Sequence, residues 1–374
     1  MTLKILHTGD IHIGITFGSR GYSDPLRRQL VEARFEVTER IVNKANEEKC
    51  DLLVIAGDLF DRANVKKVDI ERTAKILKSF TGKCVAVLPG NHDFYDGTVD
   101  LWKNFQENAP DNTILLLETK PYPLEELDIN AVLYPAPCNS KHSEEHNLGW
   151  LHKLEKRPEA KWHIGIAHGA LSGVCPDFNG RYYNMDEQNL RDLGLDLWLL
   201  GHSHVRYPDI DEFNDSKVIY SGTPEPDGFD CDHCGYACLI TLKDTGLLRG
   251  KSVSTGKFRF KEIQKVVSSK YDLEKLKSEL TSSNSDNLLV KLKISGRLGI
   301  EEFESRQKIY DAIRGSIVHL EIDDFHLELE ITQDVVDKEF TNGSLPYRIL
   351  SNLAKTGEKQ ALQIAYELIQ KVRK

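Results

Sequence analysis

The sequence lacks any long apolar run. No stretch approaches the roughly 18 to 20 consecutive apolar residues that a membrane-spanning helix needs. The apolar start of the chain is interrupted by Lys4 and followed at once by Gly9 and Asp10, so it lacks the apolar core of a secretory signal peptide. We therefore expect a soluble protein with no membrane partner.

The sequence also lacks an even set of cysteines and an excess of positive charge. Seven cysteines scattered through 374 residues argue against a disulfide framework and for free thiols in a reducing compartment, most simply the cytoplasm. The net charge of −9 argues against nucleic acid held on a broadly basic surface, so any such binding must be local. Bound divalent cations could supply that local charge.

Two domains are expected from the length and from the pattern of apolar residues, since 374 residues exceed what one hydrophobic core usually organises. Residues 1–265 alternate short apolar runs with amphipathic segments, and residues 266–374 have the pattern of a smaller α+β domain. The tail carries helical apolar stripes at 345–353 and 361–372. We expect these apolar faces to pack on their own domain, and the alternative is that they bind a partner protein.

Five short apolar runs in the first domain are typical of buried strands, and each ends in Gly, His or Asp. Helices are expected at 24–48, with Asp24 as N-cap, and at 69–79. This alternation predicts an α/β domain with helices flanking the sheets. The five runs cover residues 4–8, 52–56, 84–88, 162–167 and 197–200.

A short polar motif follows each of the five runs. Ligands gather at the carboxyl ends of strands in α/β sheets, so motifs that are far apart in the sequence can converge there. The motifs are GDIH at 9–12, GDLFDR at 57–62, GNHD at 90–93, AHG at 167–169 and GHSH at 201–204.

Together the motifs offer a mixed set of oxygen and nitrogen ligands. Seven ligands are too many for one tetrahedral ion, but they suit two ions that share a carboxylate. Carboxylates mixed with imidazoles fit manganese, iron or zinc better than calcium, and manganese is our first choice. The seven residues are Asp10, His12, Asp58, Asn91, His168, His202 and His204.

Each motif taken alone has an ordinary explanation. The two histidines of GHSH could lie on a surface loop, GNHD could be a simple turn, and the aspartates could cap helices. It is improbable that such explanations hold at five successive strand ends. A separate group, Cys231, His233, Cys234 and Cys238, could bind zinc, but no second pair follows at a suitable spacing, so free thiols on a loop and strand are favoured.

The ordered series of motifs resembles the calcineurin-type metallophosphoesterase superfamily. Within it, SGTPEP at 221–226 and the size of the second domain resemble the SbcD and Mre-eleven nuclease subunits of DNA repair. The resemblance implies an α/β/β/α sandwich in 1–265 and, in 266–374, a capping domain with terminal partner-binding helices. Asp61 stands where the archaeal and eukaryotic branch has histidine, so this position looks more like the bacterial branch.

The resemblance also implies roles for the motif residues. His92 would be the catalytic histidine, protonating the leaving oxygen or stabilising the transition state, and Asp93 could orient it. Asp58 would bridge two divalent ions. One ion would be held by Asp10, His12, Asp58 and His204, and the other by Asp58, Asn91, His168 and His202.

The implied function is a two-metal DNA exonuclease or endonuclease in DNA repair, working with an SbcC-type ATPase and possibly as a homodimer. Arg62, Lys66 and Lys67 are candidate DNA contacts, although a solvated charged face explains them equally well. A phosphatase or cyclic-nucleotide phosphodiesterase is the alternative within enzymes. A non-catalytic scaffold is the least favoured alternative, because the chain lacks none of the ligand residues.

Overall fold

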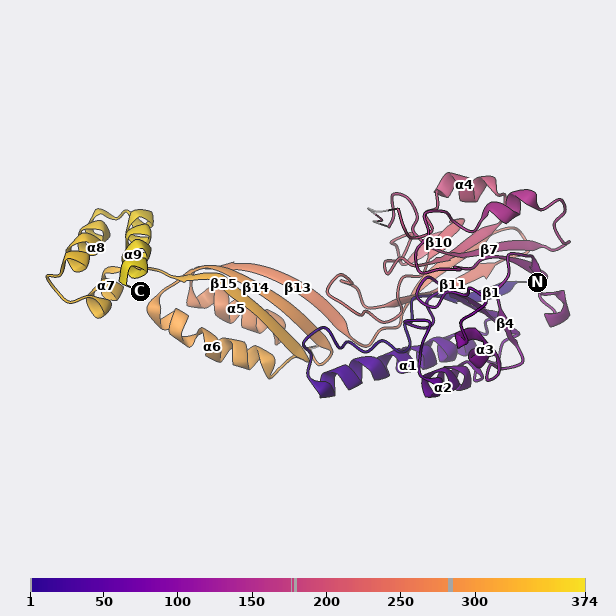
Figure 1. The fold of residues 1–374 in the computed structure, drawn as a ribbon, viewed down its shortest axis with the longest axis horizontal. Coiled ribbons are helices and arrows are strands. Elements are labelled where there is room, and N and C mark those ends of the chain that lie inside the picture. Colours follow the sequence, from indigo (N-terminus) through magenta and orange to yellow (C-terminus); the bar gives the residue numbers. More distant parts are fainter. Residues whose placement is uncertain (1, 176, 178–179, 282–284, 374) are drawn as a thin grey trace. The chain divides into compact units, whose positions relative to one another are not determined.

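The computed structural model describes residues 2–175, 177, 180–281 and 285–373. By its internal contacts the chain divides into two compact units, Met1–Arg259 and Phe260–Lys374 (Figure 1). Each unit has its own sheets and its own hydrophobic core.

Two sheets form the first unit. In the described residues the larger sheet has the strand order β4-β3-β2-β1-β11-β12-β9, with β1 to β4 parallel and β11 antiparallel to β1. Its strands are β1 (Leu3–Thr8), β2 (Leu52–Ala56), β3 (Cys84–Leu88), β4 (Thr113–Leu115), β9 (Glu212–Asn214), β11 (Tyr236–Leu242) and β12 (Leu248–Ser254).

The smaller sheet has the order β10-β8-β7-β6-β5. Its strands β6, β7, β8 and β10 are parallel to one another, and β5 is antiparallel to β6. Its strands are β5 (Tyr122–Pro123), β6 (Ala131–Ala136), β7 (Trp162–His168), β8 (Leu197–Gly201) and β10 (Val218–Tyr220). All five apolar runs predicted from the sequence are therefore strands, three in the larger sheet and two in the smaller.

The two sheets pack face to face. Alternate residues of β1 point to opposite faces, so Ile5 lies in the core between the sheets, with Ile164 of β7, while Leu6 faces outward. The outer face of the larger sheet is covered by α1 (Asp24–Glu47), α2 (Lys67–Leu77) and α3 (Leu101–Gln106). The outer face of the smaller sheet packs against α4 (Glu187–Asp192) and a 3-10 helix, η2 (Gly149–Lys153). The predicted sandwich of sheets flanked by helices is confirmed.

The start of α1 differs in one detail from the sequence prediction. Ser23, not Asp24, is the N-cap, because Ser23 has an extended backbone and its hydroxyl oxygen accepts a hydrogen bond from the Leu26 amide at 3.5 Å. Asp24 and Pro25 then occupy the first turn, where an acidic side chain and a proline are both favourable.

The second unit contains a three-stranded sheet in the order β13-β14-β15, with helices α5 and α6 packed against it. The elements are β13 (Arg259–Val267), α5 (Lys270–Leu280), β14 (Leu288–Leu298), α6 (Ile300–Arg314) and β15 (His319–Leu329). Strand β13 pairs with β14, and its residues from Phe260 onward belong to this unit.

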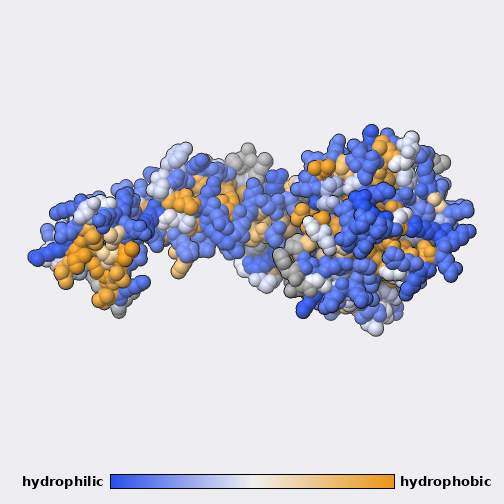
Figure 2. Space-filling view, turned by 90° about the horizontal axis from the view of Figure 1, so that it is seen from above, coloured by the Kyte–Doolittle hydropathy of each residue, from blue (hydrophilic) through white to orange (hydrophobic). Residues whose placement is uncertain are grey.

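Three helices follow the sheet of the second unit: α7 (Gln333–Glu339), α8 (Leu345–Thr356) and α9 (Lys359–Arg373). They share a small core that includes Val336, Leu350 and Leu362. Part of their apolar surface stays exposed, as the hydrophobic side chains gathered over these helices in Figure 2 show, and Leu345 and Leu368 are 72% and 57% exposed.

None of the described helices combines the length and the apolar character that crossing a membrane requires. All seven cysteines lie in the described part of the chain, and each is a free thiol.

Candidate metal centre

Each of the five motifs lies at the carboxyl end of a parallel strand: β1, β2 and β3 in the larger sheet, and β7 and β8 in the smaller. The packing of the sheets brings these ends together. The Asp10 carboxylate accepts hydrogen bonds from the backbone N–H of His202 at 3.1 and 3.0 Å. The Nδ1 atom of His168 lies 2.8 Å from the carbonyl oxygen of Ala56. Side chains from both sheets therefore line one site.

The backbone of the site is unusual. Asp10, His12, Asp58 and His202 all have positive φ, between 51° and 101°. Non-glycine residues rarely adopt this conformation, and such residues cluster at functional sites. Hydrogen bonds between the first two motif loops hold it in place, because the amides of Asp10 and His12 donate to the carbonyls of Gly57 and Asp58 at 3.1 and 3.0 Å.

Asp58 lies at the centre of one group of side chains. Its Oδ2 atom is 3.3 Å from Nε2 of His168, and its Oδ1 atom accepts the backbone N–H of His92 at 2.8 Å. The amide Oδ1 of Asn91 is 3.0 Å from Nε2 of His168 and 3.2 Å from Nδ1 of His202. Asp58, Asn91 and His168 are each no more than 2% exposed. Four ligand-type side chains thus meet here, three of them almost fully buried and His202 partly so.

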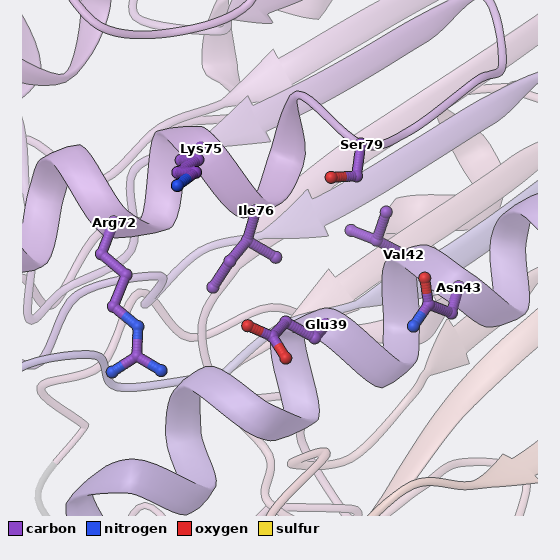
Figure 3. Close-up of a pocket in the computed structure, with 7 residues that line it drawn as sticks. All are labelled: Glu39, Val42, Asn43, Arg72, Lys75, Ile76 and Ser79. Atoms are coloured by element: carbon purple, nitrogen blue, oxygen red, sulfur yellow. The ribbon is translucent and has the colours of Figure 1, made fainter.

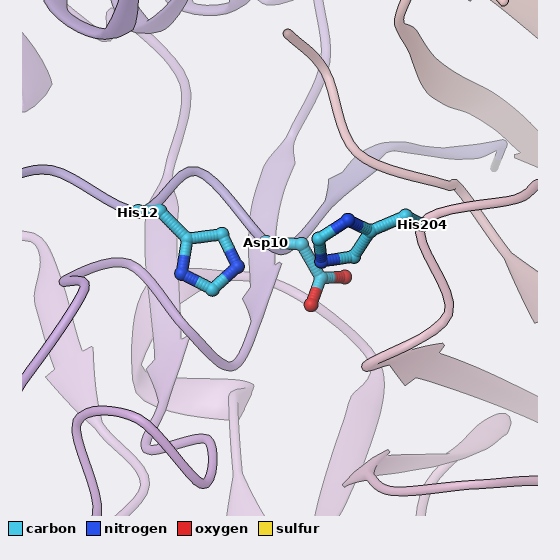
Figure 4. A group of neighbouring side chains, drawn as sticks. All are labelled: Asp10, His12 and His204. Carbon is cyan, nitrogen blue, oxygen red and sulfur yellow. The ribbon is translucent and has the colours of Figure 1, made fainter. Parts of the chain in front are cut away.

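A second group consists of Asp10, His12 and His204, whose ligand atoms lie within 4.8 Å of one another (Figure 4). The Nε2 atom of His12 is 3.8 Å from Oδ2 of Asp58, so Asp58 faces both groups. Both ring nitrogens of His12 are buried and lack a hydrogen-bond partner. Burying ring nitrogens without a hydrogen-bond partner costs free energy unless another group binds them. A cation bound to the His12 ring would meet this need.

The electrostatics of the ligand-type residues agree with cation binding. Burial lowers the pKa of His12 and that of His202 to about 3, so both imidazoles are neutral and can each offer a lone pair. Burial raises the pKa of Asp10 to about 6. Burial alone would lower the pKa of His168, but the Asp58 carboxylate beside it raises that pKa to about 9. The protons bound by Asp10 and His168 offset the negative charge of the carboxylates, and divalent ions would offset the same charge.

His92 lies beside these groups, with its ring centroid 4.9 Å from that of His12. Its Nδ1 atom is 2.9 Å from the carbonyl oxygen of Asp61, which can only accept, so Nδ1 carries the proton and Nε2 is left for other partners. The expectation that Asp93 orients His92 is corrected. The Asp93 carboxylate accepts the backbone N–H groups of Phe60 and Gly90 at 2.9 and 2.7 Å, which fixes the second and third motif loops.

One pocket between the first two helices is not part of this site. It has a volume of about 350 Å³ and lies between α1 and α2, as the side chains in Figure 3 show. No motif residue lines it, and its lining includes Glu39, Arg72 and Lys75 on the outer helices.

The calcineurin-like phosphoesterase family matches residues 3–206, a segment that holds all five motifs and more than half of the chain. The chain belongs to this family. Members of the calcineurin-like phosphoesterase family use a dinuclear centre of divalent metal ions, and the two groups around Asp58 are candidate ligand clusters for it.

Curated relatives support the same assignment. The chain is 27% identical over 229 residues to the uncharacterized metallophosphoesterase YhaO of Bacillus subtilis, covering 60% of this chain and 53% of YhaO. It is 25% identical over 243 residues to the DNA double-strand break repair protein Mre11 of Methanopyrus kandleri, covering 60% and 49%. The Mre11 protein of Archaeoglobus fulgidus is 25% identical over 236 residues, covering 60% and 50%. The aligned part thus spans about half the length of each relative.

Sequence reasoning did not place two residues of this phosphoesterase beside His204. Asp227 and Cys231 both approach its Nδ1 atom, at 3.7 and 3.6 Å. They lie on the loop between β10 and β11, after the SGTPEP segment, and no strand-end motif marks them. Cys231 was considered together with His233, Cys234 and Cys238, but Cys238 lies in β11, opposite His7 of β1.

Proposed function

We propose that this chain is a DNA nuclease that hydrolyses phosphodiester bonds at a centre of two divalent ions, and that it acts in DNA repair. One observation carries the proposal: the Asp58 carboxylate stands between His168, at 3.3 Å, and His12, at 3.8 Å, each with further ligand-type residues around it. The similarity to proteins named for DNA double-strand break repair supports DNA as the substrate.

Asp58 would be shared between the two ions. Asp10, His12 and His204 would complete the ligands of one ion, and Asn91, His168 and His202 those of the other. Mixed carboxylate, amide and imidazole ligands suit Mn²⁺, which remains our choice. When bound, two ions polarise the phosphoryl oxygens and lower the pKa of a nearby water, which makes attack at neutral pH feasible.

His92 would act on the leaving group. Its Nδ1–H donates to the Asp61 carbonyl, which fixes the ring and directs Nε2 away from that contact. When the ring also carries a proton at Nε2, as imidazolium, that proton can pass to the sugar oxygen that leaves when the phosphodiester bond breaks, and His92 is left neutral. Proton transfer of this kind contributes about two to four orders of magnitude in rate. The Asp93 carboxylate supports this geometry indirectly, because it holds the loops that carry Asp58 and Asn91.

A pocket that Arg62 of the second motif helps to line is a candidate site for a phosphate backbone. It has a volume of about 680 Å³ and is lined by residues that include Gly14, Arg28, Arg62 and Lys66. The Arg62 guanidinium donates to the carbonyl of Gly14 and to the carboxylate of Asp61 at 3.1 and 2.7 Å, which links the pocket to the second motif. We propose that Arg28, Arg62 and Lys66 contact DNA phosphates. Lys67 does not line this pocket, and three carboxylates do: those of Asp24, Glu32 and Asp69.

The exposed apolar residues of α8 and α9 are proposed to bind an SbcC-type ATPase. Leu345, Ile349, Ile364 and Leu368 are all more than 40% exposed, and a partner helix would remove their apolar surface from water. With no membrane-spanning helix among the described residues and seven free thiols, we place this complex in the cytoplasm.

The decisive experiment compares substrates on the purified chain. Linear duplex DNA, single-stranded DNA, a cyclic nucleotide and a generic phosphate monoester are incubated with Mn²⁺ or with chelator, and products are separated by electrophoresis and chromatography. We expect Mn²⁺-dependent shortening or nicking of DNA at rates well above those on the small esters. If a small ester is hydrolysed rapidly while the DNA stays intact, the chain is instead a phosphatase or a cyclic-nucleotide phosphodiesterase.

A further inference from the structure

His204, Asp227 and Cys231 form a compact group of three different ligand-type side chains, which we call the Cys231 triad. The Nδ1 atom of His204 is 3.6 Å from the Cys231 sulfur and 3.7 Å from Oδ1 of Asp227. The same Oδ1 atom is 3.8 Å from the sulfur. Cys231 and Asp227 are 1% and 7% exposed, whereas the His204 side chain is 29% exposed and gives access from solvent.

The three distances also fit a metal site. The two to the Cys231 sulfur, 3.6 and 3.8 Å, are compatible with weak thiol hydrogen bonds, but the third is not. A nitrogen and a carboxylate oxygen 3.7 Å apart are too far apart for a hydrogen bond, which needs about 2.7 to 3.2 Å. Around a tetrahedral Zn²⁺, with bonds of about 2.3 Å to sulfur and about 2.0 to 2.1 Å to nitrogen and oxygen, neighbouring ligand atoms lie roughly 3.3 to 3.6 Å apart. The triad is within a few tenths of an ångström of this arrangement.

His204 can serve this triad and the dinuclear centre through different atoms. Its Nδ1 atom faces Asp227 and Cys231. Figure 4 shows the opposite edge of the ring directed towards the Asp10 carboxylate, and the ligand atoms of Asp10 and His204 lie within 4.8 Å. A neutral imidazole offers a lone pair at one ring nitrogen only, so His204 binds ions on both sides at once by releasing its ring N–H proton to water and bridging them as imidazolate.

The carboxylate of the triad is held in place by a buried cation. Arg34 is 1% exposed and lies 3.9 Å from Oδ2 of Asp227, which leaves Oδ1 for the triad. The Arg34 guanidinium also donates to the carbonyls of Glu225 and Pro226 at 2.6 and 3.2 Å, so the segment leading to Asp227 is fixed. A ligand that is already positioned loses little conformational entropy when an ion binds.

We propose that His204, Asp227 and Cys231 bind a thiophilic divalent cation of the Zn²⁺ class, separately from the two ions of the dinuclear centre. The Cys231 thiol releases its proton on binding, so that a thiolate and a carboxylate balance the charge of the ion, and a water occupies the fourth position. Because the ion holds the ring of His204, its binding changes the position of one ligand of the dinuclear centre. Zn²⁺ then modulates any Mn²⁺-dependent activity. The site itself does not require that the chain cleave DNA.

Cadmium titration of the metal-free chain tests the site, because a thiolate bound to Cd²⁺ has an ultraviolet charge-transfer absorption. We expect this absorption to reach its maximum at one bound thiolate per chain and to disappear in Cys231→Ser. Cys234→Ser and Cys175→Ser are matched controls, since both thiols are more exposed than Cys231, and both variants should keep it. Asp227→Asn should keep the thiol but weaken the affinity for Cd²⁺ by at least about tenfold. Circular dichroism checks that each variant is folded.

Two results would overturn the proposal: no thiolate absorption at stoichiometric Cd²⁺, or an unchanged absorption in folded Cys231→Ser. Either would leave Asp227 and Cys231 as mere structural neighbours of His204. The outcome is independent of the proposed nuclease function. A chain that binds Cd²⁺ through Cys231 but leaves DNA intact keeps the site and rejects the nuclease, and an active nuclease without the absorption does the opposite.

Discussion

The Nε2 atom of His168 lies 3.0 Å from the Oδ1 atom of Asn91, although 77 residues separate them along the chain. His168 ends β7 of the smaller sheet, and Asn91 follows β3 of the larger sheet. Neither sheet carries the full set of ligand-type residues. The candidate centre therefore exists only because the sheets pack with the carboxyl ends of these strands at the same edge.

Replacing Asp58 with Asn should remove the carboxylate that faces both groups of ligands. Asn tolerates the positive φ of this position, 51°, so the fold should persist. We expect the affinity for Mn²⁺ to fall by at least about a hundredfold in calorimetry, and metal-dependent hydrolysis to be lost. Asp128→Asn is the matched control, because Asp128 has a φ of 57° and its side chain is 90% exposed. Full activity in Asp58→Asn would contradict the shared-carboxylate scheme.

Replacing His92 with Asn should separate metal binding from proton transfer. The variant keeps the proposed ligands, so metal content measured by elemental analysis should equal that of the parent chain. Hydrolysis should slow by about two to four orders of magnitude, because the leaving oxygen loses its proton donor. The exposed His152, changed to Gln, serves as control. A rate within a factor of a few of the parent would remove His92 from the mechanism.

Gly57→Ala tests the close approach between the two sheets. A Cβ atom at Gly57 would lie 2.1 Å from Nδ1 of His168, so this ring must move from its contact with the Ala56 carbonyl. Gly97→Ala has a similar φ, 83° against 90°, but nothing within 4 Å of the added atom. Gly97→Ala should lose roughly 1 to 2 kcal/mol of stability from the positive φ, measured by urea unfolding, and Gly57→Ala should lose more because of the clash. Only Gly57→Ala should also lose affinity for Mn²⁺, and equal affinities would show that His168 does not need this packing.

His7, buried in β1, should make stability depend on pH. Burial lowers its pKa in the folded state to about 3, whereas an unfolded histidine has a pKa of about 6.5. Above pH 6.5 both states are neutral at His7. As the pH falls below that value, only the unfolded chain binds the proton, so stability falls by up to about 1.4 kcal/mol per pH unit until the folded pKa is reached.

Urea unfolding with chelator at about pH 7 and about pH 5 measures this effect. His7→Leu should reduce the loss of stability between these two conditions by roughly 2 kcal/mol, since it removes one such proton. His152→Gln, at an exposed position, should leave the loss unchanged. An identical pH dependence in His7→Leu would mean that His7 is already charged, or solvated, in the folded state.

Charged residues on the terminal helices should block the proposed partner. Leu345 and Leu368 are 72% and 57% exposed, so Leu345→Glu and Leu368→Glu can be accommodated without unfolding the domain. We expect the double variant to lose co-purification with an SbcC-type ATPase while keeping its metal-dependent activity. Phe325→Glu, at an 85% exposed position on β15, is the control in the same unit. Undiminished co-purification of the double variant would refute the role of α8 and α9.

The strands and the motif residues could be predicted from the sequence because they depend on residues that are neighbours along the chain. Short β-branched and aliphatic runs such as Leu52–Ala56 can be recognised because a strand buried on both faces must be apolar throughout. The polar residue after each run is visible because Gly and Asp tolerate the sharp turn and positive φ that ends the strand, as Gly57 and Asp58 do. These features depend on residues close together in the chain.

Contacts between distant segments were decided by the tertiary structure alone. Asp93 follows His92 directly, yet its carboxylate is occupied by the amides of Phe60 and Gly90, because it points between two loops rather than along its own. Asp227 and Cys231 reach His204 only once the loop after β10 is fixed by Arg34. Aspartate and cysteine side chains are short and occur in many environments. Their residue type therefore does not predict that packing will place them beside His204.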